Sequence, residues 1–227
     1  MLIKRILTAL LLVITFSASA QVQMTVFGGP QITTARYSVR DTVQPTQYKP
    51  GFMVGAGAKV VFDKGFYFFP AIYYSMKGYK VTLHNPSFPP TELALDNSTT
   101  IHTIEIAPLF QIDLSGSPSH FFVRFGPSVD FAFSGKEQFD TAVNAPRINR
   151  NMKFDFTEYG HFTASANIHI GYETNNGIMV FAQYVYGIGN LNDADGGPRI
   201  LNRVFGISAG WLFNKIKDKG RYRKFRG

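Results

Sequence analysis

Cysteine is absent from the 227-residue chain. The sequence therefore excludes disulfide bonds, a cysteine-linked lipid anchor, a thiol nucleophile and any metal site that depends on cysteine ligands. Stability has to come from backbone hydrogen bonding and from the burial of side chains.

Long apolar runs are also absent after the first twenty residues. The chain begins with Lys4 and Arg5, continues with an apolar stretch from Ile6 to Phe16, and then reaches the small residues Ala18-Ser19-Ala20. This order is typical of a secretory signal peptide and its cleavage site. The apolar stretch is shorter than the roughly 20 residues that a spanning helix needs. We therefore expect export and a mature chain that begins at Gln21.

Net charge is absent from the central part of the chain. Residues 21–213 contain 14 basic and 14 acidic residues, whereas residues 214–227 contain seven basic residues and one acidic residue. The excess of basic residues therefore describes the tail and does not indicate a nucleic-acid surface on the central part, and we expect no nucleic-acid partner. The basic tail is expected either to be solvated and disordered, or to bind an anionic headgroup or an acidic periplasmic partner.

Strict alternation of apolar and polar residues is the strongest pattern present. In His161–Glu173, HFTASANIHIGYE, one face is apolar and the other carries His, Thr, Ser, Asn and Glu. A period of two over thirteen residues predicts a long β-strand. The same pattern predicts eight strands at about 21–32, 51–62, 66–82, 99–114, 120–133, 156–173, 178–190 and 201–213.

The connections between these strands are of two kinds. Short turns, DKG, SGSPS and TNNG, alternate with longer polar loops at about 33–50, 83–98, 134–155 and 191–200. Short turns at one end and long loops at the other are typical of outer-membrane barrels, in which the turns face the periplasm.

Three motifs carry a resemblance to a known family: YYSMKGY (Tyr73–Tyr79), FGPSVDFAFSGK (Phe125–Lys136) and NRVFGISAGWLF (Asn202–Phe213). From about Gly51 to Phe213 the chain resembles small outer-membrane β-barrel proteins of the porin family or PorT-like type, common in Bacteroidetes-type Gram-negative bacteria. The family more usually has Glu-Ile-Pro where this chain inserts Ala107, which points to a bulge or shifted register near Pro108.

The resemblance implies an all-β fold, an eight-stranded antiparallel up-and-down transmembrane β-barrel in the cell outer membrane, and it carries no catalytic residues. We expect a signal peptide at 1–20, the barrel at 21–213 and a basic periplasmic tail at 214–227. A soluble barrel of the lipocalin type is the alternative, in which the apolar faces point inward. Aromatic residues near the strand ends favour the membrane. The expected belts are Phe121, Tyr172, Trp211 and Phe213 on the periplasmic side, and Phe133, Tyr159, Tyr186 and Phe205 on the outer side.

An eight-stranded barrel is only wide enough for its interior to be filled by side chains. Buried charges of both signs are expected to pair there, because an unpaired charge in a low-dielectric interior is costly. The predicted network has two groups. The upper group, nearer the long loops, is Lys77, Glu105, Asp130 and His161, and the lower group, nearer the short turns, is Lys59, Arg124 and His169.

Catalysis receives little support from the sequence. His161 and Ser165 share a strand face but lie about 13 Å apart at ~3.3 Å per residue, whereas a general base has to lie within roughly 3 Å of the proton that it removes. His161 and His169 are farther apart still, so we expect no catalytic residue, metal or cofactor.

Two classes of function are left open by the sequence. One is a monomeric structural or adhesive barrel that contacts outer-membrane lipid and whose loops, Arg36–Tyr48 and Asn144–Phe154 in particular, meet an extracellular or periplasmic protein. The other is a narrow transport channel or an accessory component of the type IX secretion system, as one member of the resembling family is.

Overall fold

The structure is a computed structural model that describes residues 22–142 and 146–213. The expected signal peptide and basic tail lie outside the described residues. Among the residues described, no helix has the length and apolar character needed to cross a membrane.

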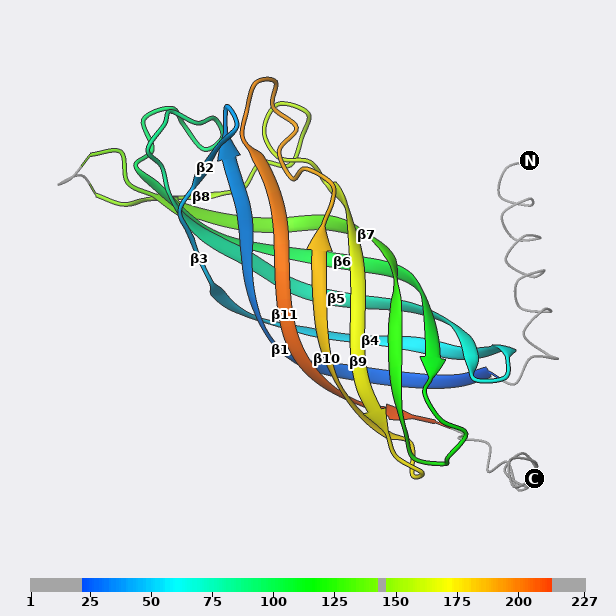
Figure 1. Ribbon diagram of the computed structural model, residues 1–227. Helices are drawn as coiled ribbons and strands as arrows, with labels where there is room; N and C mark the ends of the chain where they lie inside the picture. The colour runs from blue at the N-terminus through cyan, green and yellow to red at the C-terminus, as the bar shows by residue number, and fades with distance from the viewer. Residues whose placement is uncertain (1–21, 143–145, 214–227) are drawn as a thin grey trace, which may run out of the picture.

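Eight long strands of the described chain form one closed antiparallel ring (Figure 1). Each pairs with its neighbours along the chain, and β11 pairs with β1 to close the ring, so the expected up-and-down barrel is confirmed. The ring comprises β1 (Val22–Val39), β4 (Lys49–Asp63), β5 (Phe66–Thr82), β6 (Asp96–Asp113), β7 (His120–Phe139), β9 (Phe162–Glu173), β10 (Ile178–Gly187) and β11 (Arg199–Leu212).

Short strands extend the ring at one end, where the long loops lie (Figure 1). These are β2 (Thr42–Gln44), β3 (Thr46–Gln47) and β8 (Ile148–Asn151), which pair with β1, β5 and β7. We call this end the loop end, and the opposite end, with its short connections, the turn end.

The predicted strand boundaries are wrong mainly at the loop end. Strands β1 and β7 continue to Val39 and Phe139, because β2 and β8 supply partners for their upper parts. Residues 156–161 were expected to begin a strand but lie before β9, and residues 188–190 lie beyond β10. The hairpin between β1 and β2 turns at Arg40 and Asp41, which have φ angles of 45° and 66°. Its sequence lacks the Asn-Gly signal of such turns, so the sequence suggested a loop.

The expected register shift near Pro108 is also wrong. Pro108 lies opposite Pro70 in a continuous β5–β6 ladder, and the shift between β6 and β7 falls at His102 and Thr103 instead. Pairing with β7 is interrupted between Ile106 and Phe110 but resumes in the same register. A proline has no N–H to donate, so a local loss of pairing there needs no extra residue.

The outer wall of the barrel is apolar. Outward side chains in its middle band, such as Val54, Ile72 and Ile106, are about half exposed or more, which excludes the inward-facing arrangement of a soluble barrel. Aromatic side chains flank this band in two belts. Exposed rings at the turn end include Phe121, Tyr172, Trp211 and Phe213, and those at the loop end include Phe133, Tyr186 and Phe205. Tyr159 was expected in the second belt but is fully buried among the loops.

The interior is filled by side chains of mixed polarity. An apolar cluster packs in the lower part of the barrel and includes the rings of Phe27, Phe69, Phe122 and Phe181. Ionic groups lie above and below it. The expected polar plug is therefore only part of the filling.

Candidate functional site

The upper ionic group joins three neighbouring strands. Lys77 Nζ on β5 lies 2.7 Å from Glu105 Oε1 on β6 and 2.8 Å from Asp130 Oδ2 on β7. All three side chains are almost completely buried. The Thr163 and Ser165 hydroxyls on β9 each donate to Asp130 Oδ2 over 3.2 Å. Four strands of the ring are thus held by one buried lysine and its two carboxylates.

His161 does not belong to this group, which corrects the sequence-based expectation. It precedes β9, its Nδ1 lies 2.7 Å from the Ala132 carbonyl oxygen, and its ring stacks between Phe131 and Phe154. Residues 156–161 leave the strand alternation, so the period-two count no longer places this side chain inside the ring.

The lower ionic group closes the turn end. Lys59 Nζ on β4 lies 2.8 Å from Asp113 Oδ2 and 3.0 Å from Glu173 Oε2, and His120 Nε2 lies 3.0 Å from Asp113 Oδ2. Gln111 donates to the other Asp113 oxygen over 2.7 Å. Sequence reasoning named Lys59 but did not place Asp113, His120 or Glu173 with it.

Three members of the lower group are potential metal ligands. Asp113, His120 and Glu173 present ligand atoms that lie within 4.8 Å of one another. The Lys59 ammonium contacts the same carboxylate oxygens, so it already supplies the positive charge that a cation would bring. A divalent ion would require Lys59 to withdraw. Spacing along the chain did not indicate this group because its members come from β6, β7 and β9.

Among the residues that the structure describes, neither Arg124 nor His169 forms an ion pair with a carboxylate, contrary to the expectation that every interior charge pairs. Arg124 donates through Nε and Nη2 to Gln111 Oε1 over 3.2 and 2.8 Å, and its guanidinium lies 3.4 Å from the centre of the Phe69 ring. His169 stacks on Phe181 with ring centres 5.2 Å apart. An amide oxygen and aromatic faces therefore hold these two side chains.

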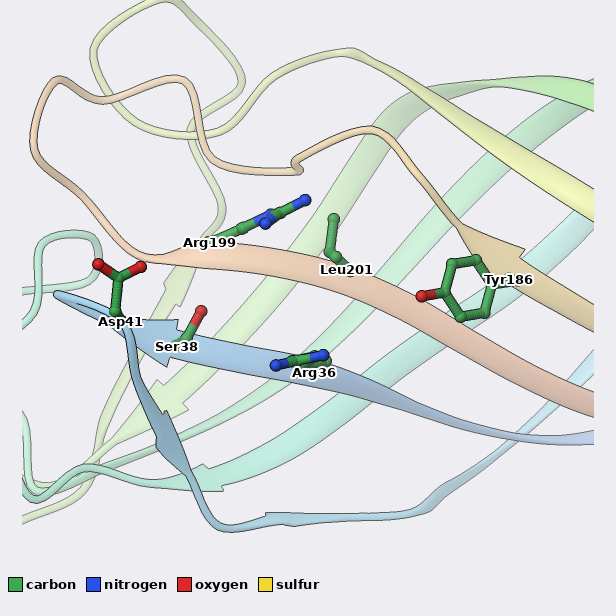
Figure 2. Close-up of a pocket in the computed structure, with 6 residues that line it drawn as sticks. All are labelled: Arg36, Ser38, Asp41, Tyr186, Arg199 and Leu201. Carbon is green, nitrogen blue, oxygen red and sulfur yellow. The ribbon is translucent and has the colours of Figure 1, made fainter.

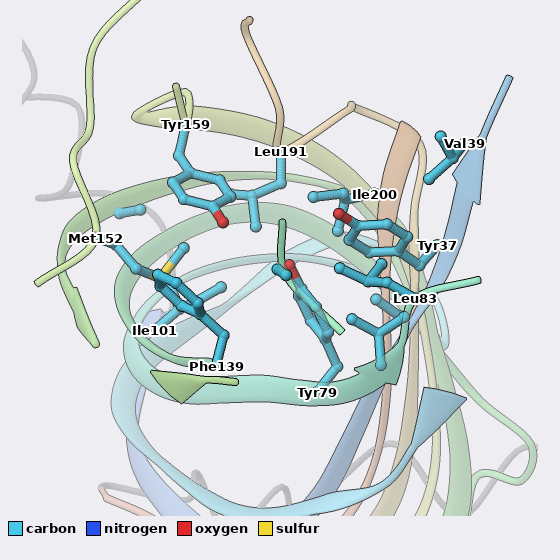
Figure 3. Packing of buried hydrophobic residues seen from close by; sticks show 14 residues of the cluster. Tyr37, Val39, Tyr79, Leu83, Ile101, Phe139, Met152, Tyr159, Leu191 and Ile200 are labelled. Atoms are coloured by element: carbon cyan, nitrogen blue, oxygen red, sulfur yellow. The ribbon is translucent and has the colours of Figure 1, made fainter. Parts of the chain in front are cut away.

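A second apolar cluster closes the loop end, and Figure 3 shows its side chains pointing toward one another across the opening. The cluster consists of Ala35, Tyr37, Val39, Tyr79, Val81, Leu83, Ala94, Ile101, Ala132, Phe139, Met152, Tyr159, Leu191 and Ile200.

Glu137 anchors the loops over this cluster. Its Oε1 accepts from Arg150 Nε over 2.6 Å, and its Oε2 accepts from the Tyr159 hydroxyl over 2.7 Å and from Asn97 Nδ2 over 3.0 Å. Arg150 also donates to Glu158 Oε2 over 2.6 Å. Burial, and then the neighbouring Tyr79 and Glu137, raise the pKa of Tyr159 well above its usual range, so its hydroxyl stays a donor.

The Glu137 group was missed by the sequence reasoning because the alternation of β7 changes phase. Phe133 and Ser134 are both exposed, at the register shift opposite His102 and Thr103, and beyond them Gly135, Glu137 and Phe139 are buried. Extending the period from Asp130 would have placed the Glu137 carboxylate outside.

A closed ring of eight strands with an apolar outer wall, two aromatic belts and a filled interior defines a transmembrane β-barrel. The chain belongs to the outer membrane protein beta-barrel domain family, whose model matches residues 10–193. The protein is accordingly an outer-membrane protein.

Solved structures that are similar to this chain include outer-membrane proteins. Ail of Yersinia pestis, in complex with the heparin analogue sucrose octasulfate, is 11% identical with a TM-score of 0.41, covering 84% of this chain and 99% of Ail. OprG of Pseudomonas aeruginosa is 11% identical with a TM-score of 0.44, covering 84% and 95%. Neisserial surface protein A is 9% identical with a TM-score of 0.42, covering 83% and 96%. No curated protein matches the chain.

Proposed function

We propose that the protein is a non-conducting outer-membrane barrel whose loop end presents a structured extracellular surface to a protein partner. The observation that carries this proposal is a set of apolar side chains on otherwise ordered loops. Phe156 is 90% exposed, Leu93 70% and Phe88 42%. Apolar patches that face water mark binding surfaces, and Phe88 and Leu93 share the β5–β6 loop.

Contacts between the loops support a fixed surface. Arg150 Nη2 donates to the Pro90 carbonyl oxygen over 3.3 Å, which joins β8 to the β5–β6 loop. The Asp193 N–H donates to the Glu158 carbonyl oxygen over 3.0 Å, which joins the β10–β11 loop to the segment between β8 and β9. A partner would therefore bind without first paying the cost of ordering the loops.

The alternative of a narrow transport channel receives less support. Two apolar clusters and two ionic groups lie along the barrel axis, and an eight-stranded ring leaves little room beside them. A PorT-like accessory role in type IX secretion is compatible with partner binding, and we keep it as the more specific form of the same proposal.

An enzymatic role receives no support from the geometry of the residues that suggested it. The Ser165 hydroxyl donates to Asp130, and His161 contacts a backbone carbonyl oxygen on β7. We therefore propose a binding protein, monomeric in the membrane and without nucleic-acid contacts.

The test compares partner capture by two double variants. Intact cells are treated with a membrane-impermeant crosslinker, and the tagged barrel is purified. Leu93→Ser with Phe156→Ser should lose an adduct that the wild type forms. Glu92→Gln with Asp195→Asn, exposed polar positions on the β5–β6 and β10–β11 loops, should keep it. An adduct pattern that is the same in both variants, or no adduct at all, would contradict the proposal.

A further inference from the structure

We propose that the outer wall of the barrel at the loop end holds the phosphate group of an outer-leaflet lipid between Arg36 and Arg199. This site is separate from the loop surface proposed above. It is formed by the outward faces of β1 and β11, with a contribution from β10 (Figure 2).

Register places the two arginines on the same wall. Arg36 lies opposite Leu201, and Arg199 lies opposite Ser38, so the arginines are diagonal neighbours on paired strands. The alternate residues Tyr37 and Ile200 are fully buried inside the ring. Arg36 and Arg199 therefore point away from the interior, as exposed side chains.

A cavity of about 150 Å³ lies between them. Figure 2 shows side chains from three strands and the adjoining turn around this space. The lining residues are Arg36, Ser38, Asp41, Tyr186, Arg199 and Leu201.

The cavity has an excess of positive charge. Within the part of the chain that the structure describes, neither Arg36 nor Arg199 forms an ion pair, and Asp41 is the single acidic residue of the lining. Their guanidinium groups repel each other, because diagonal positions on paired strands lie within reach of long side chains. An anion between the two guanidinium groups would remove that repulsion, and guanidinium forks bind phosphate oxygens in pairs.

The wall beside the cavity is held firmly. The Arg203 guanidinium lies 3.6 Å from the centre of the Tyr186 ring and donates to the carbonyl oxygens of Gly187 and Asn202 over 3.0 and 2.8 Å. Tyr186 lines the cavity, so its position is fixed before any ligand arrives. Arg203 adds a further positive charge nearby.

Height in the membrane identifies the source of the phosphate. On the outward face of β11, the apolar side chains of Ile207 and Phe205 are 63% and 45% exposed. Toward the loop end, the same face continues with Arg203 and then Arg199. Along β1 it runs from Ile32, 50% exposed, to Arg36. Aromatic belts mark the boundary of the hydrocarbon, and basic residues immediately beyond it meet lipid headgroups. The cavity therefore lies where the phosphates of the outer leaflet lie.

The experiment measures lipid retention by the full-length protein. Barrel purified in detergent is mixed with bisphosphorylated lipid A or with the same lipid without phosphate, and complexes are counted by native mass spectrometry. Wild type should retain the phosphorylated lipid preferentially, and Arg36→Gln with Arg199→Gln should weaken that retention by about tenfold or more, the range expected for loss of two charge-assisted contacts. Asp41→Asn should strengthen it.

A matched control distinguishes binding in this cavity from general electrostatic attraction between exposed cations and the lipid. Lys80→Gln with Lys136→Gln removes two exposed cations from outward positions on β5 and β7, and should change retention less than twofold. An equal loss in both double variants would overturn the proposed site. Displacement of the lipid by millimolar inorganic phosphate would overturn the lipid as ligand. Heat-modifiable gel mobility verifies that each variant is folded.

Discussion

Lys77 is the residue on which the charge balance of the upper interior depends. Lys77→Met would leave Glu105 and Asp130 buried without a cation, and such a loss costs about 3–5 kcal/mol. Arg147→Gln is a matched control, because Arg147 also contacts two carboxylates at 2.8 Å but is 37% exposed, and its loss should cost about 1 kcal/mol or less. Urea unfolding, followed by the fluorescence of the single tryptophan, Trp211, measures both. Equal effects would contradict the assignment of Lys77 as the central cation.

A different prediction follows for Arg124, because the Gln111 amide and the Phe69 ring hold its side chain in place of a carboxylate. Arg124→Met should leave Gln111 without its donor and cost about 1–3 kcal/mol. Gln111→Leu should also destabilise the barrel, because it removes the hydrogen bond that Gln111 donates to Asp113. The double variant should lose less stability than the sum of the two single losses, since both changes remove the same Arg124–Gln111 contacts. Chemical unfolding of the three variants tests this, and losses that simply add would contradict it.

At the residue scale, sequence reasoning could place side chains inside or outside but could not pair them. Alternation correctly put Lys59, Lys77, Glu105, Arg124 and Asp130 on inward faces. Which of them meet depends on the stagger between strands, and that stagger depends on hydrogen-bond register around the whole ring. For the same reason the Asp113, His120 and Glu173 group was not foreseen.

At the level of the strands and their connections, the long loops and the short turns predict which end of the barrel faces the cell exterior. A peptide tag inserted between Arg40 and Asp41, at the β1–β2 hairpin of the loop end, should bind antibody on intact cells. The same tag between Asn175 and Asn176, in the short turn from β9 to β10, should bind only after the outer membrane is made permeable. The reverse pattern would show that the barrel is inserted the other way up.

Glu137, near the loop end of β7, holds the neighbouring loops through its contacts to Arg150 and Tyr159. Glu137→Gln should weaken the contacts to Arg150 and Tyr159, so the segment after β8 opens more often and external protease cleaves it several-fold faster. Glu92→Gln, which alters an exposed carboxylate of a neighbouring loop, should leave the cleavage rate unchanged. Limited proteolysis of intact cells measures both rates. Equal rates would mean that other contacts hold the segment.

Strand bounds were predicted better at the turn end of the barrel than at the loop end. Strand β5 was predicted with its observed bounds, because the DKG turn precedes it and a polar, proline-containing segment follows Thr82. Strands β1 and β7 were predicted too short, because their outer parts pair with β2 and β8 and not only with ring neighbours. A short strand of two to four residues leaves too little alternation to detect.

For the molecule as a whole, we propose that side chains close the barrel from end to end. Among the described residues, the ionic group at the turn end, the two apolar clusters and the Lys77 group lie along the barrel interior. We expect them to leave no continuous aqueous path for ions. Wild-type protein in planar lipid bilayers should therefore show no stable single-channel current, with insertion verified by protease protection of a labelled sample. Reproducible conductance steps from inserted wild-type protein would contradict the account.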